Sequence, residues 1–184
     1  MNKDFDPNRI LVLDDFLADY DPLREPSLAS AELINLRSNY RLRGYLGTNT
    51  DVETCPRFGD VVKNIPRACK QLGLPMLRSV SGLIYIVSEQ GDPFQVNIHR
   101  DDTAHDPWGY TFSYHWQGQE GSGGTVWYRD TAGRQELGRV EFKPNRLVAF
   151  PAGYPHTGYA HPDQPNGSRR VILAAFTVLD PRRY

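Results

Sequence analysis

The character of the sequence changes near residue 79, and the second part constrains the fold most. From there to about residue 178, short runs rich in β-branched and aromatic residues alternate with clusters of Gly, Pro, Asn and Asp. Runs of this kind, bounded by turn residues, are typical of β-strands. Such strands in close succession predict an all-β sandwich or barrel. We expect strands at residues 80–88, 94–99, 110–116, 125–128, 139–142, 147–150 and 169–178.

The first part of the chain is predicted to be mainly helical. Apart from a short strand at residues 10–13, its apolar residues recur at helical spacing in two places. One set is Leu28, Leu33, Ile34 and Leu36, and the other is Val61, Val62, Ile65, Cys69 and Leu72. Within the second set, Pro66 is expected to kink or interrupt the helix and Gly73 to end it.

Length and composition fit one globular domain over residues 1–184. The chain has 8 Phe, 10 Tyr and 3 Trp, which is ample for a core. A chain of this length has no room for a second independent core. We therefore expect a helical support over residues 1–79, packed against a β core over residues 80–178.

Charge and cysteine content exclude several classes. The formal net charge of -1 argues against a nucleic-acid partner, because nucleic-acid-binding domains usually carry a basic excess. No apolar run reaches the ~18 residues of a membrane span, and the N-terminus lacks the pattern of a signal peptide. Cys55 and Cys69 form no CxxC pair, so we expect a reduced, cytoplasmic setting. The sequence does not indicate the oligomeric state.

The candidate chemistry starts at His99-Arg100-Asp101, at the end of an expected strand. Residues i and i+2 of a strand share a face, so His99 and Asp101 can present an imidazole and a carboxylate side by side. A second histidine from a distant strand would complete a face of two histidines and one carboxylate, which suits Fe(II). A second copy, His161-Pro162-Asp163, lies between prolines in an expected loop with no histidine after it, and we discount it.

The second histidine is expected at His156. It follows a turn, the apolar strand at residues 147–150 and another turn. Arg169 opens the last expected strand, where a guanidinium can hold the carboxylate of an acidic cosubstrate by two hydrogen bonds. Arg170 competes for this role, because both faces of that strand are apolar and alternation does not choose between them.

Together these elements resemble the Fe(II)- and 2-oxoglutarate-dependent oxygenases, especially the small prolyl-hydroxylase-like branch. The resemblance covers roughly residues 80–178. It comprises the His-x-Asp motif, Gly123-Gly124-Thr125 before an aromatic strand, residues 145–150 leading to His156, and Gly167-Ser168-Arg169. The opening Leu13-Asp-Asp-Phe-Leu17, followed by Leu23-Arg-Glu25, also resembles the start of that branch.

The resemblance implies a double-stranded β-helix, a jelly-roll and cupin-like core. It implies His99, Asp101 and His156 as iron ligands and Arg169 as the partner of the distal carboxylate of 2-oxoglutarate. The implied reaction uses Fe(II), 2-oxoglutarate and O2 to hydroxylate an aliphatic C–H bond. Iron halogenases lack the carboxylate ligand, so the presence of Asp101 favours hydroxylation. The expected substrate is a small molecule such as an amino acid, with a peptidyl residue such as proline as the second choice.

Two other classes remain. Pro151-Ala-Gly153-Tyr-Pro-His156 also matches the second cupin motif, so a cupin-type metalloprotein, either an enzyme without 2-oxoglutarate or a binder, is the alternative. Against it, the first cupin motif needs a histidine where Asp101 stands. The third class is an interaction protein in which the His-x-Asp is accidental.

Several positions stay undecided from the sequence. Either the aromatic set or the polar set (Thr111, Ser113 and His115) of residues 110–116 faces inward, to shape a substrate pocket or to touch the cosubstrate. His105 and His161 are interpreted as loop residues and His115 as a strand residue. Asn97 shares the face of His99, whereas Arg100 points the other way.

Overall fold

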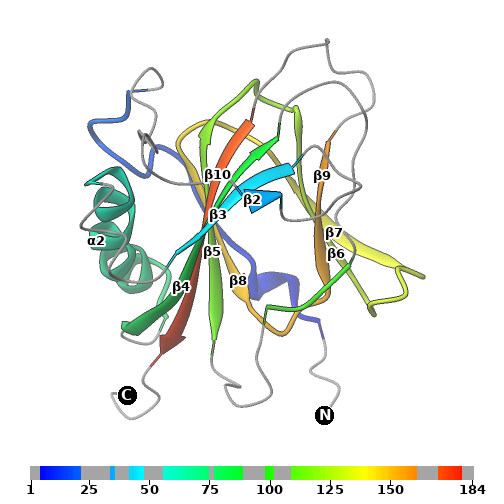
Figure 1. Ribbon diagram of the computed structural model, residues 1–184. Helices are drawn as coiled ribbons and strands as arrows, with labels where there is room; N and C mark the ends of the chain where they lie inside the picture. The colour runs from blue at the N-terminus through cyan, green and yellow to red at the C-terminus, as the bar shows by residue number, and fades with distance from the viewer. Residues whose placement is uncertain are drawn as a thin grey trace.

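The computed structural model consists of two β-sheets and one long helix (Figure 1). The residues described are 5–21, 34–35, 42–47, 56–74, 77–88, 98–101, 109–160 and 170–179. The large sheet has seven strands in the order β1-β8-β5-β10-β4-β3-β2, and the small sheet has three in the order β7-β6-β9. All described strand pairs are antiparallel.

The elements follow the expected β pattern in the second part of the chain. The large sheet contains β1 (Leu11–Leu13), β2 (Ile34–Asn35), β3 (Leu42–Gly47), β4 (Leu77–Ser88), β5 (Tyr110–Gln117), β8 (Arg146–Pro151) and β10 (Arg170–Leu179). The small sheet contains β6 (Gly123–Tyr128), β7 (Glu136–Glu141) and β9 (His156–Ala160). The helices are the short 3-10 turn η1 (Pro7–Arg9) and α2 (Pro56–Gln71).

The helix α2 packs on one face of the large sheet, while the small sheet lies on its other side (Figure 1). Its buried residues, including Val61, Ile65 and Cys69, form one apolar cluster with alternate residues of β5. The helix ends at Gln71. Gly73 follows with a φ of 63°, and the Leu74 amide donates to the Cys69 carbonyl at 2.8 Å, as in a Schellman cap.

Strand β5 separates the two sides of the large sheet. Four of its aromatic residues belong to the cluster with α2: Tyr110, Phe112, Tyr114 and Trp116. The residues between them, Thr111, Ser113 and His115, are therefore on the opposite face, toward the small sheet. The structure thus decides that the polar set of this strand faces inward.

The prediction of a helical first part is wrong in two respects. Ile34 and Asn35 form β2, which pairs with β3, and β3 itself was not expected. Pairing with the sheet edge overrides a helix-like spacing that covers only a few residues. In addition, Pro66 does not interrupt α2, which continues to Gln71. One α-helix is present among the described residues, and Leu28, Leu33 and Leu36 of the other expected helix lie outside them.

Among the described residues, no helix is both long and apolar enough to cross a membrane. The expected strand at 94–99 lies largely outside the described residues, as does Cys55. Cys69 is buried, and burial raises the pKa of its thiol to about 11, which fits its interpretation as a core residue.

Candidate metal centre

Two distant chain segments meet through a backbone bridge at His99 and His156. The His99 amide donates to the His156 carbonyl at 3.0 Å, and the His156 amide donates to the His99 carbonyl at 2.9 Å. This bridge adds residue 99 to the free edge of β9 and places the two imidazoles on the same face. Their ring centroids are 4.5 Å apart.

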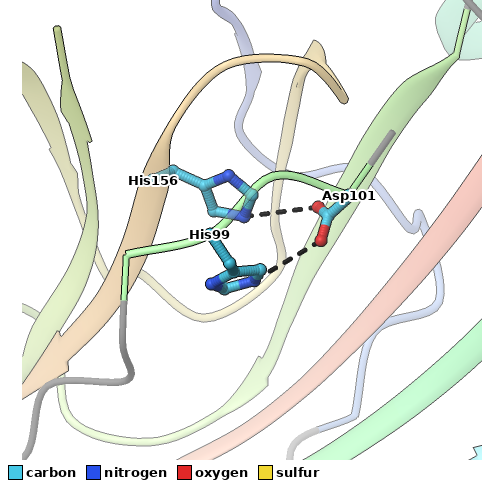
Figure 2. Close-up of side chains that lie close together, drawn as sticks. All are labelled: His99, Asp101 and His156. Atoms are coloured by element: carbon cyan, nitrogen blue, oxygen red, sulfur yellow. Dashed lines mark ion pairs between the residues drawn. The ribbon is translucent and has the colours of Figure 1, made fainter. Parts of the chain in front are cut away.

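The Asp101 carboxylate lies against both imidazoles (Figure 2). Its Oδ1 is 3.4 Å from His99 Nε2, and its Oδ2 is 3.3 Å from His156 Nε2. One ligand atom from each of the three residues lies within 4.8 Å of the others. The structure therefore brings together the three residues that the sequence predicted as a cluster.

Neighbouring groups fix the orientation of Asp101. The Thr111 hydroxyl donates to Asp101 Oδ2 at 2.6 Å, and the Asp101 amide donates to the Ala152 carbonyl at 2.9 Å. Burial raises the pKa of this carboxyl, but the contacts with the His156 and His99 imidazoles and the hydrogen bond from Thr111 outweigh it, so the pKa falls well below its ordinary value. Asp101 is thus ionised, and its carboxylate oxygens can bind a cation.

The protonation of His156 is set by Tyr154. His156 Nδ1 lies 2.8 Å from the Tyr154 carbonyl, which can only accept, so Nδ1 carries the proton. In the neutral ring, Nε2 then turns a lone pair toward an Asp101 carboxylate oxygen, which is also an acceptor. Two acceptors at 3.3 Å repel each other unless a cation, either a metal ion or a second ring proton, lies with them.

The donor set fits Fe(II). Two imidazole nitrogens and one carboxylate oxygen on a single face are the ligands of non-heme iron sites with open positions. Ligand atoms held about 2.1 Å from one cation at right angles are roughly 3 Å apart, close to the two measured separations. The side chain of His99 is 38% exposed, compared with 8% for Asp101 and His156, so the His99 side of the cluster is open to solvent.

Phe150 forms an apolar wall behind His156. The two rings meet edge to face with centroids 4.7 Å apart. Phe150 pairs with Thr111 across β8 and β5, so it lies on the same inward face. It also packs with Trp127, Val148 and Tyr154 in a second buried cluster between the sheets.

Comparisons by sequence and by structure give different results. No protein-family model and no curated protein matches the sequence. Among solved structures, the chain is similar to SnoN, a non-heme α-ketoglutarate-dependent epimerase from nogalamycin biosynthesis. The TM-score is 0.68 and the identity 15%, over 92% of this chain and 77% of SnoN.

Two prolyl hydroxylases are similar as well. One, from Trichoplax adhaerens, was solved with a peptide fragment of the hypoxia inducible factor oxygen degradation domain (TM-score 0.62, 16% identity, 93% of this chain and 84% of that protein). The other is a Pseudomonas putida prolyl-4-hydroxylase (TM-score 0.59, 16% identity, 93% and 92%). The chain has the fold of Fe(II)- and 2-oxoglutarate-dependent oxygenases.

The structure does not bring the remaining candidate residues to this cluster. Arg169, Asn97, His105 and His161 lie outside them. His115 is fully buried: its ring stacks on Phe142 at 4.6 Å, and its Nδ1 accepts from the Lys143 amide at 3.3 Å. These contacts fit the interpretation of His115 as a strand residue.

Sequence reasoning missed the groups that orient the ligands. The Tyr154 and Ala152 contacts use main-chain carbonyls, for which the residue type gives no signal. Thr111 was one of three polar residues whose direction was open, and only the packing of α2 on the aromatic face decides it.

Proposed function

We propose that the protein is an Fe(II)- and 2-oxoglutarate-dependent dioxygenase that hydroxylates an aliphatic C–H bond. The iron ligands in this proposal are His99, Asp101 and His156. The observation that carries it is the cluster of these three side chains on one inward face, within a fold shared with such oxygenases. The substrate is a small molecule such as an amino acid, or a peptidyl residue such as proline.

The topology supports the finer fold assignment. Along the chain, β4, β5, β8 and β10 enter the large sheet, and β6, β7 and β9 enter the small one. This distribution, with the centre between the sheets, is what we expect for a double-stranded β-helix. We also keep residues 1–184 as one domain in this proposal.

When bound, iron and 2-oxoglutarate would supply the oxidation: O2 would convert 2-oxoglutarate to CO2 and succinate, which takes up one oxygen atom, and the other oxygen atom would be inserted into the C–H bond. The protein's own residues would hold the metal ion and orient its ligands. Asp101 supplies the negative charge that attracts Fe(II), and Thr111 keeps its carboxylate turned toward the imidazoles. Phe150 limits water behind His156. The exposed side of His99 leaves room for a substrate to approach.

The distal carboxylate of 2-oxoglutarate needs a cationic partner. Arg169 is the proposed partner from the resemblance. Arg170, the first residue of β10, is its competitor. Substitution of each arginine distinguishes the two.

The similar structures leave the substrate class open. One similar protein is an epimerase from nogalamycin biosynthesis, and another was solved in complex with a peptide fragment. The prediction that neither nucleic acid nor membrane is a partner rests on the net charge and the lack of a long apolar run.

An anaerobic visible spectrum tests the proposal. Purified protein receives Fe(II), then 2-oxoglutarate, with His99→Ala as control. We expect a weak charge-transfer band only when both are present, and none in the control. Metal binding without this band would instead indicate a cupin-type metalloprotein. An absence of metal binding would contradict the metal centre altogether.

A further inference from the structure

Tyr154 connects the candidate metal centre to the N-terminal residues, through its main-chain carbonyl on one side and its side-chain hydroxyl on the other. Its carbonyl accepts from His156 Nδ1 at 2.8 Å. Its hydroxyl accepts from the Asp6 amide at 3.0 Å and donates to the Asp6 carbonyl at 3.3 Å. The side chain is 1% exposed. The residue that fixes the proton on a proposed iron ligand is thus itself held by the first described residues of the chain.

The residues that contact the Tyr154 hydroxyl belong to a turn held by hydrogen bonds, in which Asp6 caps η1. The Asp6 carboxylate accepts from the backbone amide and the side-chain amide of Asn8, both at 2.9 Å. The Arg9 amide donates to the Asp6 carbonyl at 3.0 Å, and Pro7 occupies the first position of η1. Asp6 therefore presents its amide and carbonyl to Tyr154 in a fixed direction.

Packing and a hydrogen bond also connect the same turn to neighbours of His156 and Asp101. The Phe5 ring lies 5.1 Å from the Tyr154 ring. Phe5 also packs against the second buried cluster, in which Phe150 contacts His156. Arg9 donates to the Tyr110 hydroxyl at 3.3 Å. Tyr110 precedes Thr111, the residue that holds Asp101.

We propose that Tyr154 is a positioning residue for His156 and that the N-terminal turn at residues 5–9 acts on the metal centre through it. This inference rests on the proposed function only in taking His156 as a metal ligand. Loss of the Tyr154 hydroxyl removes the hydrogen bonds to Asp6. The Tyr154 carbonyl is then less fixed and holds the His156 imidazole less firmly. The predicted result is weaker metal binding with an unchanged set of ligands.

The test is a titration with Co(II), a probe that binds the same nitrogen and oxygen ligands. Losing a direct hydrogen-bond partner of a ligand weakens metal affinity roughly 10–100-fold. The Tyr154 hydroxyl acts one step further away, so we expect Tyr154→Phe to raise the Kd about 3- to 10-fold. Phe5→Ala, which leaves Tyr154 intact, should raise it in the same direction.

Tyr20→Phe is the matched control. The Tyr20 hydroxyl also donates to a main-chain carbonyl, that of Trp116 at 2.6 Å, but Tyr20 packs against the α2 cluster. Tyr20→Phe should lower Tm and leave the Co(II) Kd unchanged. A Kd in both Tyr154→Phe and Phe5→Ala equal to that of the control would overturn the inference. Co(II) binding that survives His99→Ala would instead overturn the metal centre, so the two failures are distinguishable.

Discussion

The two faces of β5 differ in what they contribute. Toward α2, the strand presents Tyr110, Phe112, Tyr114 and Trp116, which are buried in an apolar cluster. Toward the small sheet it presents Thr111, whose hydroxyl holds Asp101. One strand therefore supplies stability from one face and the support of a candidate metal centre from the other. Substitutions on the two faces are expected to have separable effects.

The largest effect is expected at the ligands. Asp101→Ala removes the only anionic member of the described cluster and should abolish turnover and metal binding. The fold should change little, because the residue lies outside the described helices and strands. Succinate formation in the presence of 2-oxoglutarate and oxygen measures the turnover. Succinate production retained in both Asp101→Ala and His99→Ala would sink the ligand assignment.

On the opposite face, Phe112→Ala should lower the free energy of unfolding by about 3–5 kcal/mol, the usual cost of removing a buried Phe side chain. Phe112 is 1% exposed and lies on the α2 side of β5, away from the candidate metal centre. The Co(II) Kd of the folded variant should equal that of the wild type. A denaturant unfolding curve and a metal titration measure the two quantities, and a large change in Kd would contradict the separation of the faces.

Arg169 and Arg170 are the two candidate partners of the distal carboxylate of 2-oxoglutarate. Arg169→Leu should raise the 2-oxoglutarate requirement about 10- to 150-fold, since a hydrogen bond to a charged group contributes roughly 1.5–3 kcal/mol. The concentration dependence of the Fe(II)–2-oxoglutarate band measures it. If Arg170→Leu has this effect and Arg169→Leu does not, the inward set of β10 includes Arg170.

A smaller effect is expected from Thr111→Val, which keeps the shape of the side chain and removes the hydroxyl that donates to Asp101. The Co(II) Kd should rise about 10-fold, as for other hydrogen-bond partners of ligands. Ser113→Ala, two residues further on the same face, is the control. Equal Kd values for the two variants would remove Thr111 from the metal centre.

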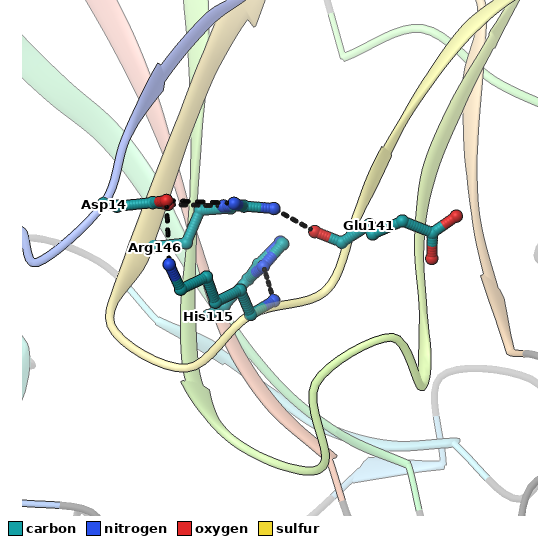
Figure 3. Close-up of polar contacts among 5 residues, drawn as sticks. Asp14, His115, Glu141 and Arg146 are labelled. Atoms are coloured by element: carbon teal, nitrogen blue, oxygen red, sulfur yellow. Dashed lines mark hydrogen bonds and ion pairs between the residues drawn. The ribbon is translucent and has the colours of Figure 1, made fainter.

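The smallest effect on stability is expected from the ion pairs of Asp14, which lie outside both faces of β5. Arg146 donates to Asp14 and to the Glu141 carbonyl (Figure 3), and Lys143 also pairs with Asp14. Hydrogen bonds from Arg146 and then Lys143 lower the pKa of Asp14 to about 2. Because this pKa is lowered on folding, the stabilisation is full above pH ~4 and is lost as the pH falls toward 2.

Asp14→Asn should therefore cost less than about 1 kcal/mol at pH 7, as is usual for an exposed ion pair. The difference in Tm between variant and wild type should shrink between pH 4 and pH 2. Thermal unfolding at several pH values checks this. A constant difference in Tm across that range would mean that folding does not lower the pKa of Asp14.

Much of the β core and the ligand cluster could be predicted from the sequence, for reasons visible in particular segments. β4, β5 and β10 have long runs of β-branched and aromatic residues, and His99-Arg100-Asp101 has the spacing of a shared strand face. β9 escaped prediction because His156–Ala160 contains Gly158 and few apolar residues. The direction of Thr111 depends on where α2 packs, which no local pattern encodes.

The bridge between His99 and His156 has a consequence for folding. The two residues are distant in the chain, so an unfolded chain does not hold them together, and a metal ion bound between them would act as a cross-link. A ligand that binds only the folded state stabilises it by about 2.7 kcal/mol at roughly 100 times its Kd. The supply of iron would then set how much of the protein is folded, as well as how fast it works.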